Sequence, residues 1–426
     1  MAVLDRQVVV VAATNNNLRK ALVAACGLIG ISGAAAEATE VSSAVMVYAE
    51  ADRVKVLEAV VSANHEFSNG SSANFRIVFD GMTGASASGA IPASFAQTFT
   101  RPSGEGSYTT PAGETPLDDS FKDTRFALSG GGVLPLNRFT NLSGGLYVSG
   151  EHDYSSLGAN TALTRDFNKR STTLALRLSY FHDTISPDGG RPIPLAVMLD
   201  PGPVQPRLEG DGTKNVMDVG VAWTQVLNRS TIAQFNYTFS KVSGYQTDPY
   251  KIVSQVNGTS GDPEYNLFES RPEDRLRHVL FGKVNHHLGR DIVSMSYRFM
   301  TDDWGIKSHT LDFTYRWNFA KTKYLRPHFR YYNQGAADFY QRYLVSGDAL
   351  PTDVSADYRL GDMVAYTIGL KHGRKVGNGH DLSFRLEYYM QTGESHPSDA
   401  IGALKDFDLY PTVGAIIFQV GYSFGL

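Results

Sequence analysis

Two pairs of residues in this sequence have the side chains of a hydrolytic site. The carboxylates of Glu151 and Asp153 could activate a water molecule, and Ser308 beside His309 has the residue types of a nucleophile and its base. Residues two apart on an extended strand face the same side, whereas adjacent residues face opposite sides. Glu151 and Asp153 can therefore share one face, but Ser308 and His309 cannot form a dyad on one strand. We expect this chain not to be an enzyme and keep a barrel hydrolase as a third hypothesis.

Two further pairs have the side chains of a metal site. His286 and His287 are neighbours, as are Asp302 and Asp303. Because strand neighbours diverge, neither pair can chelate an ion from a sheet, and a turn at the two aspartates favours hairpin capping. The single cysteine, Cys26, lies in an N-terminal apolar segment and offers no thiolate to the rest of the chain. We therefore predict no metal site and no cofactor.

Apolar and polar residues alternate, with a period of two, along the segments that contain these residues. In segment 311–319 the apolar positions are Leu311, Phe313, Tyr315, Trp317 and Phe319, and the positions between them are Asp312, Thr314, Arg316 and Asn318. Such alternation predicts strands with one apolar and one polar face. The same pattern predicts about sixteen strands, at 43–49, 53–67, 74–83, 124–136, 141–154, 157–167, 172–184, 216–227, 232–244, 277–287, 292–301, 308–319, 325–334, 360–372, 381–392 and 413–424.

Three features favour a membrane barrel over a soluble β-sandwich. All but the first of the predicted strands span roughly 9 to 15 residues, which suits a tilted bilayer crossing, and aromatic residues stand near their ends. Tight joins at 228–230, 289–290 and 320–323 alternate with long polar stretches at 84–122, 185–214, 245–276, 341–358 and 393–411. The predicted fold class is therefore all-β: an antiparallel transmembrane β-barrel with short periplasmic turns and long extracellular loops.

The two ends of the chain agree with export to a bacterial outer membrane. Arg19 and Lys20 precede an apolar segment, 21–31, and a run of small residues, 32–36, so we predict a signal peptide at 1–38 and a barrel at 39–426. In the last strand Phe418, Val420, Tyr422, Phe424 and Leu426 alternate with smaller or polar residues, as in barrels whose final strand is read by the assembly machinery. The formal net charge of -4 argues against nucleic acid. The expected partners are outer-membrane lipid and that machinery.

A series of short phrases runs from near Tyr48 to the C-terminus. They are Gly84-Ala85-Ser86, Glu151-His152-Asp153-Tyr154-Ser155-Ser156, Gly244-Tyr245-Gln246-Thr247-Asp248-Pro249-Tyr250-Lys251, Arg271-Pro272-Glu273-Asp274-Arg275, Tyr297-Arg298, Asp302-Asp303-Trp304-Gly305-Ile306, Ala336-Ala337-Asp338-Phe339-Tyr340 and Ser355-Ala356-Asp357-Tyr358-Arg359-Leu360. In these phrases the chain resembles the family of predicted bacterial outer-membrane β-barrels catalogued as domain of unknown function 3570. The resemblance implies a barrel in the bacterial envelope and no established activity. It also implies a lipoprotein or an envelope redox protein as a partner.

The polar faces of the strands carry charges that we place in the barrel lumen. An arginine on the lipid face costs roughly 2–4 kcal/mol at the bilayer midplane, so the charged face points inward. The predicted lumen-lining residues are Glu151, Asp153, Arg177, Arg298, Asp312, Arg316, Arg330, Arg385 and Glu387. They form either a selectivity lining or a ladder of salt bridges in which the opposite signs neutralise each other.

The junctions between strands and long loops carry a second set of charged and tyrosine side chains. These residues are Asp248, Tyr250, Lys251, Arg271, Arg275, Asp338, Tyr340, Asp357 and Arg359. They suit loops that fold inward and lock to the wall, and they also suit a docking surface. The leading functional hypothesis is a channel or export conduit, and the alternative is a non-conducting scaffold for a periplasmic or surface redox partner.

Overall fold

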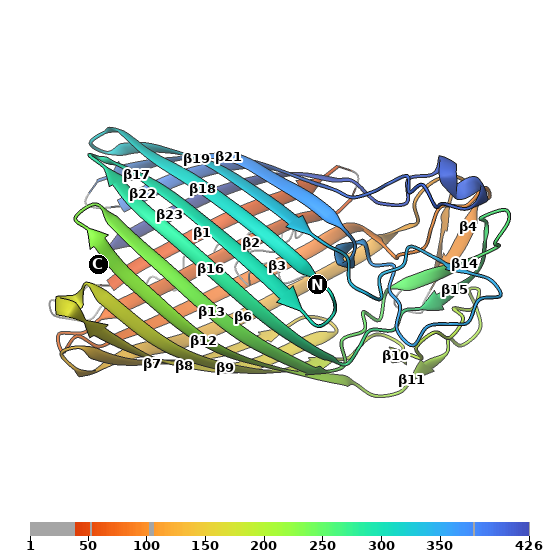
Figure 1. Cartoon of the computed structure of the whole chain (residues 1–426), viewed down its shortest axis with the longest axis horizontal. Helices are drawn as coiled ribbons and strands as arrows, with labels where there is room; N and C mark the ends of the chain where they lie inside the picture. Colours follow the sequence, from red (N-terminus) through yellow and green to blue (C-terminus); the bar gives the residue numbers. More distant parts are fainter. Residues whose placement is uncertain (1–38, 52, 102–105, 378–379, 426) are drawn as a thin grey trace.

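Sixteen strands form a closed antiparallel barrel in the computed structural model, which describes residues 39–51, 53–101, 106–377 and 380–425 (Figure 1). In order around the wall they are β1 (Thr39–Glu50), β2 (Lys55–Glu66), β3 (Ser72–Ala87), β6 (Leu117–Asn137), β7 (Thr140–Gly150), β8 (Tyr154–Phe167), β9 (Thr172–Ile185), β12 (Gly212–Asn228), β13 (Thr231–Gly244), β16 (Asp274–Leu288), β17 (Asp291–Asp302), β18 (Lys307–Ala320), β19 (Lys323–Gln334), β21 (Met363–Val376), β22 (His380–Thr392) and β23 (Val413–Gly425). Pairing of β1 with β23 closes the ring. The fold class predicted from the sequence is confirmed, and each predicted strand corresponds to one wall strand. The predicted signal peptide, 1–38, lies outside the described residues.

Alternating side chains give the wall an apolar outer face and a polar inner face. On β9, Leu176 and Tyr180 are 55% and 50% exposed on the outside, although both are large and hydrophobic. Contacts between wall strands fix the inner face, because Asp183 of β9 accepts a hydrogen bond from Ser156 of β8 and lies 3.5 Å from the amine of Lys214 on β12. Only lipid would cover so continuous an apolar band, so the surface is that of a membrane-spanning wall.

Aromatic side chains border this band at both ends. Phe67, Phe139, Phe167 and Trp317 are exposed near the short turns, and Tyr180, Tyr297, Tyr366 and Tyr388 are exposed toward the long loops. Aromatic girdles of this kind mark the two membrane interfaces of a barrel. Among the described residues, no helix has the length and apolar character to cross a bilayer.

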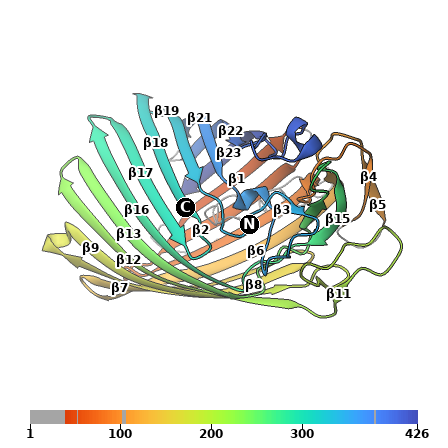
Figure 2. The same cartoon turned by 45° about the vertical axis from the view of Figure 1, so that its right-hand side comes forward.

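The two rims of the barrel differ in the length of their connections (Figures 1 and 2). At one rim the connections are short, as between β12 and β13 or between β18 and β19. At the other rim the chain runs through five long segments, 88–116, 186–211, 245–273, 335–362 and 393–412. The predicted asymmetry between turns and loops is therefore present in the structure.

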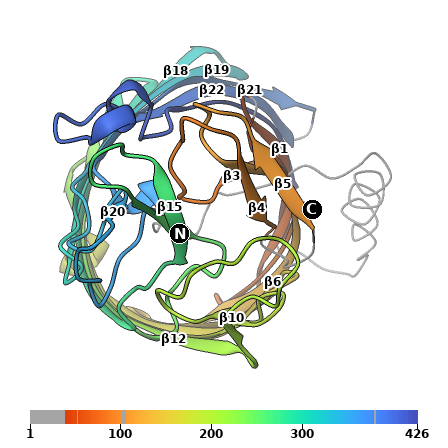
Figure 3. The ribbon, with the colours of Figure 1, turned by 90° about the vertical axis from the view of Figure 1, so that its right-hand side faces the viewer.

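The five long segments fold together into a unit that we call the loop cap. It contains the sheets β4 (Gln97–Thr100) with β5 (Ser107–Thr110), β10 (Arg191–Pro192) with β11 (Arg207–Leu208), and β14 (Ile252–Val256) with β15 (Pro263–Phe268) and β20 (Leu344–Val345). The short helices η2 (Tyr358–Leu360) and η3 (Gly402–Asp406) belong to it as well. Figure 3 shows β15 and β20 inside the ring of wall strands, across the barrel mouth.

Small hydrophobic clusters hold the loop cap together. Val253 and Leu267 pack with Leu344, Val354 and Ala356, so segments 245–273 and 335–362 share one core. Other clusters join Phe99 to Phe268, and Ile91 to Val256 and Leu404. Each core draws residues from segments that lie far apart in the sequence, which makes the loop cap a folded unit.

The first prediction tests which way the wall faces. Leu176→Arg places a charge in the apolar band and should prevent barrel assembly, because the cost is roughly 2–4 kcal/mol at the midplane. Its neighbour Ala175 faces the lumen, so Ala175→Arg should assemble. Migration of heated and unheated samples on a gel reports assembly. Equal behaviour of the two variants would contradict the assigned faces.

Candidate functional site

The structure places seven of the nine predicted lumen residues on the inner face of the wall. They are Arg177, Arg298, Asp312, Arg316, Arg330, Arg385 and Glu387, each with the strand parity of residues that contact one another inside the barrel. Arg177 of β9 is exposed, and so is Asn160, which faces inward from β8. These side chains border space that admits water and are not packed in a core.

Glu151 and Asp153 were predicted on a strand, and that placement is wrong. β7 ends at Gly150, and both residues lie in the three-residue turn before β8. Asp153 accepts a hydrogen bond from the Tyr250 hydroxyl of the loop cap. Burial and the nearby charge of Asp123 raise the pKa of Glu151 to about 7, although Arg125 opposes the shift. The sequence pattern placed them on a strand because the turn is only three residues long and does not visibly break the alternation of apolar and polar residues.

The inner face of β16 to β22 is rich in cations, in a group that we call the basic arc. Its members are Lys283, Arg298, Arg316, Arg326, Arg330, Lys371 and Arg385. Sequence reasoning missed Lys283, Arg326 and Lys371, although their strand parity matches that of the arginines it named. The arc therefore carries more positive charge than the mixed lining that was predicted.

Two acids on the same wall, Asp312 and Glu387, are held by one histidine. His328 of β19 contacts Asp312 through Nε2 at 3.0 Å and Glu387 through Nδ1 at 2.9 Å. With both ring nitrogens on carboxylates, His328 bridges β18, β19 and β22 on the lumen side. Arg385 is 3.7 Å from the second oxygen of Glu387. Part of the predicted salt-bridge ladder is thus present, but it centres on a histidine that the sequence reasoning did not name.

In the loop cap, five charged residues converge on what we call the loop ion cluster: Asp248, Glu269, Arg271, Asp357 and Arg359. The Arg271 guanidinium donates to Glu269 at 3.1 Å and to Asp357 at 2.9 Å. Arg359 donates to both Asp357 and Asp248, at 2.8 Å in the latter case. The cluster thereby ties segment 245–273 to segment 335–362.

Because the cluster is buried, separating its charges would destabilise the loops. Glu269 is fully buried and Asp357 is 1% exposed, so each would be costly to leave without a partner. Burial raises the pKa of Asp357, but the charges of Arg359 and Arg271 outweigh it and hold that pKa well below its ordinary value. Burial also raises the pKa of Asp248, but the charges of Lys251 and Arg359 outweigh it and lower that pKa to about 2. The two aspartates are therefore ionised at neutral pH.

Glu269 was not among the predicted site residues. Besides Arg271, two hydrogen-bond donors contact its carboxylate. The Ser355 hydroxyl donates to one of its oxygens, and the Asp248 N–H donates to the other at 2.7 Å. Burial raises the pKa of Glu269, although Arg271 opposes the shift. The spacing of Glu269 and Arg271 held the missing signal, since residues two apart share a face in an extended segment.

The other predicted loop residues lie around the cluster. Lys251 is buried and donates to the carbonyl of Ala87 at the end of β3. Arg275 pairs with Asp302 and stacks over Trp304, 4.2 Å from the ring centre. Asp338 and Tyr340 do not join the ion cluster. They lie beside a separate apolar cluster that contains Trp304, Phe339 and Leu360.

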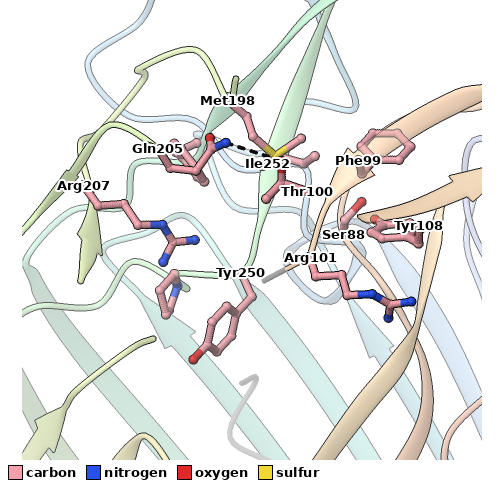
Figure 4. A pocket seen from close by; sticks show the side chains of 12 residues that line it. Ser88, Phe99, Thr100, Arg101, Tyr108, Met198, Gln205, Arg207, Tyr250 and Ile252 are labelled. Carbon is pink, nitrogen blue, oxygen red and sulfur yellow. Dashed lines mark hydrogen bonds between the residues drawn. The ribbon is translucent and has the colours of Figure 1, made fainter. Parts of the chain in front are cut away.

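A small pocket lies inside the loop cap (Figure 4). Its lining includes Phe99, Met198, Gln205, Arg207, Tyr250 and Phe268. Arg207 stacks over Phe268 and donates to the carbonyls of Asp188 and Gly190. The enclosed volume is about 20 Å³, which is room for roughly one water molecule. The pocket is too small for an organic ligand, and the lumen is the larger candidate site.

The second prediction tests the loop ion cluster. Arg271→Ala leaves Glu269 and Asp357 buried with one partner fewer, which should destabilise the loop cap by about 3–5 kcal/mol. The barrel wall should still assemble, because the cluster lies outside it. Limited proteolysis of the loops, on samples that pass the heat-migration assay, measures the effect.

A matched control is available in the same cap. Arg342 pairs with Glu394, whose side chain is 59% exposed, so Arg342→Ala should cost only about 0–1 kcal/mol. Equal protease sensitivity in the two variants would contradict a locking role for the buried cluster.

Comparisons with known proteins give a family and a set of distant barrels. The siderophore receptor PirA from Acinetobacter baumannii aligns at 9% identity over 84% of this chain and 53% of its own, with a TM-score of 0.39, so this chain spans about half of its length. Pseudomonas aeruginosa OccK5 (OpdH) aligns at 8% identity over 92% of this chain and 98% of its own, with a TM-score of 0.41. OmpT of Vibrio cholerae aligns at 8% identity over 93% of this chain and 100% of its own, with a TM-score of 0.43.

At these identities and scores, the fold assignment rests on the strand pairing of the chain itself. A search of curated proteins found no match. The model of a family of proteins of unknown function, DUF3570, matches residues 18–424. Because that match covers nearly the whole chain, the protein belongs to the DUF3570 family.

Proposed function

We propose that this protein is a channel in the bacterial outer membrane, with an entrance narrowed by the loop cap. The observation that carries the proposal is the exposure of inward-facing residues at mid-wall, Arg177 and Asn160 above all. A polar lumen that admits water lowers the barrier that the bilayer core sets against charged solutes. The outer apolar band and its aromatic borders support the membrane location.

The loop cap adds a constraint at the mouth. Its cores and its ion cluster hold β14, β15 and β20 across the opening of the barrel. A folded cap of this kind limits the size of the solutes that enter, as inward-folded loops do in wide barrels. The proposed channel is therefore selective by size at the mouth and by charge along the wall.

The third prediction concerns conduction. The purified barrel should give stepwise currents in a planar lipid bilayer. Asp357→Asn removes a charge that Arg271 and Arg359 share, which should loosen the cap and raise the single-channel conductance or admit larger solutes. Arg342→Ala serves as the control and should conduct like the parent. Absence of current from all three proteins would instead favour the non-conducting scaffold, which co-purification of a redox partner would then test.

The fourth prediction concerns orientation. Both described ends of the barrel lie at the short-turn rim, which we assign to the periplasm, and the loop cap then faces the exterior. An epitope inserted between Pro397 and Asp399 should be labelled on intact cells. One inserted between Lys321 and Lys323 should be labelled only after the outer membrane is opened. The reverse pattern would contradict the assigned orientation.

A further inference from the structure

We propose that the basic arc binds small oxyanions, phosphates and carboxylates, as they pass through the lumen. This inference rests on the proposed channel for its physiological meaning, but the binding site itself is argued from the wall. Three cations on neighbouring strands carry the argument. They are Arg326 of β19, Lys371 of β21 and Arg385 of β22, which we call the cationic row.

The cationic row is set in register by the strand pairing. Arg326 lies directly opposite Lys371, and Lys371 lies directly opposite Arg385. Side chains opposite one another in antiparallel strands have Cβ atoms roughly 4.5–5.5 Å apart, and like charges in that position destabilise a sheet. Two such pairs in succession cost stability unless a negative charge lies among them.

The protein supplies little of that negative charge. Within the described part of the chain, Arg326 and Lys371 form no ion pair, and the same holds for Lys283, Arg298 and Arg330 elsewhere in the basic arc. Of the acids on this wall, Asp312 and Glu387 already accept hydrogen bonds from His328, and Asp381 of β22 acts on Lys371 electrostatically without forming an ion pair with it. Arg385 alone reaches one of them, at 3.7 Å. The row therefore retains capacity for an anion from solution.

The wall across the lumen leaves room for such an anion. β9 and β22 stand seventh and fifteenth in the order of the sixteen-strand ring, so they are eight strands apart and opposite each other. The inward positions of β6 to β12 near mid-wall are mostly small: Ser129, Gly131, Ser143, Gly145, Ala162, Ala175, Gly220 and Ala222. Arg177, Asn160 and Asp218 are the larger inward residues of these strands, so the large basic side chains on one wall face mostly small side chains on the other.

The chemistry of the row points to oxyanions. A guanidinium presents a planar fork of N–H donors that fits two oxygens of a carboxylate or phosphate, and an ammonium adds a compact positive charge. A lysine between two arginines suits a group with several oxygens better than it suits a halide. Arg316 extends the positive surface on β18, where it stacks over Tyr324 at 3.8 Å.

The experiment separates the oxyanion site from the channel. Binding of inorganic phosphate, and in a second arm of succinate, is measured by calorimetry on the detergent-solubilised barrel at constant ionic strength. Lys371→Gln should weaken binding by about ten- to hundredfold, the effect of losing one charge-assisted contact. Lys371→Arg should retain it. Arg177→Gln, which removes an inward cation from the opposite wall, should bind like the parent.

Thermal stability gives an independent readout of the same variants. Lys371→Gln relieves repulsion from both neighbours, so its barrel should unfold at a higher temperature than the parent in the absence of anion. Added phosphate should stabilise the parent and not the variant. A purely structural lysine would show the opposite, a loss of stability with no dependence on phosphate.

The outcomes are distinct. If the parent binds neither anion, or if Lys371→Gln and Arg177→Gln weaken binding equally, the proposed site is wrong. Binding of one anion alone identifies whether phosphates or carboxylates are preferred. In the bilayer, phosphate should reduce the chloride current of the parent and not that of Lys371→Gln. Anion binding without any current would keep the site and contradict the channel.

Discussion

The closed ladder of backbone hydrogen bonds is the constraint on which the rest of this structure depends. In the hydrocarbon core of a bilayer there is no water to satisfy an N–H or a carbonyl, so a sheet can span it only without edges. Pairing of β1 with β23 removes the last edge. Once the ring is closed, every wall residue must face either lipid or the lumen, and the sequence has to alternate accordingly. The positions of Leu176 and Arg177 follow from that geometry.

The same constraint explains why charge collects in two places. Charged side chains are excluded from the outer band, so they go to the lumen or to the loops. In the loop cap they are paired: Arg271 with Glu269 and Asp357, in a site almost closed to water. A buried pair of this kind adds little net stability relative to an apolar core, but it penalises any arrangement that separates its members. The cap is therefore held in one conformation by charge and by its small apolar cores together.

Much of the wall could be predicted from the sequence, because a strand needs only local information. The period of two in 311–319 or 174–181 depends on neighbouring residues, and so does the face of Arg330. The loop cap could not be predicted in this way. Its core brings Val253 to Leu344 and Val354, residues about a hundred positions away with no shared period. Glu269 was missed for a related reason, since its donor Ser355 lies in another loop, as does Asp357, with which it shares Arg271.

The charges of the loop ion cluster and those of the basic arc are arranged differently, and the difference bears on function. The loop cap and the basic arc use the same residue types, yet the loop ion cluster pairs both of its arginines with carboxylates, whereas Arg326 and Lys371 form no ion pair within the described residues. A wall selected only for stability would place acids opposite Arg326 and Lys371, since cross-strand pairs of opposite charge are favourable and like pairs are not. The register instead aligns cations across three strands. This alignment of like charges lowers the stability of the wall at one specific place. A negatively charged solute that neutralises the cations while it is bound explains that cost best.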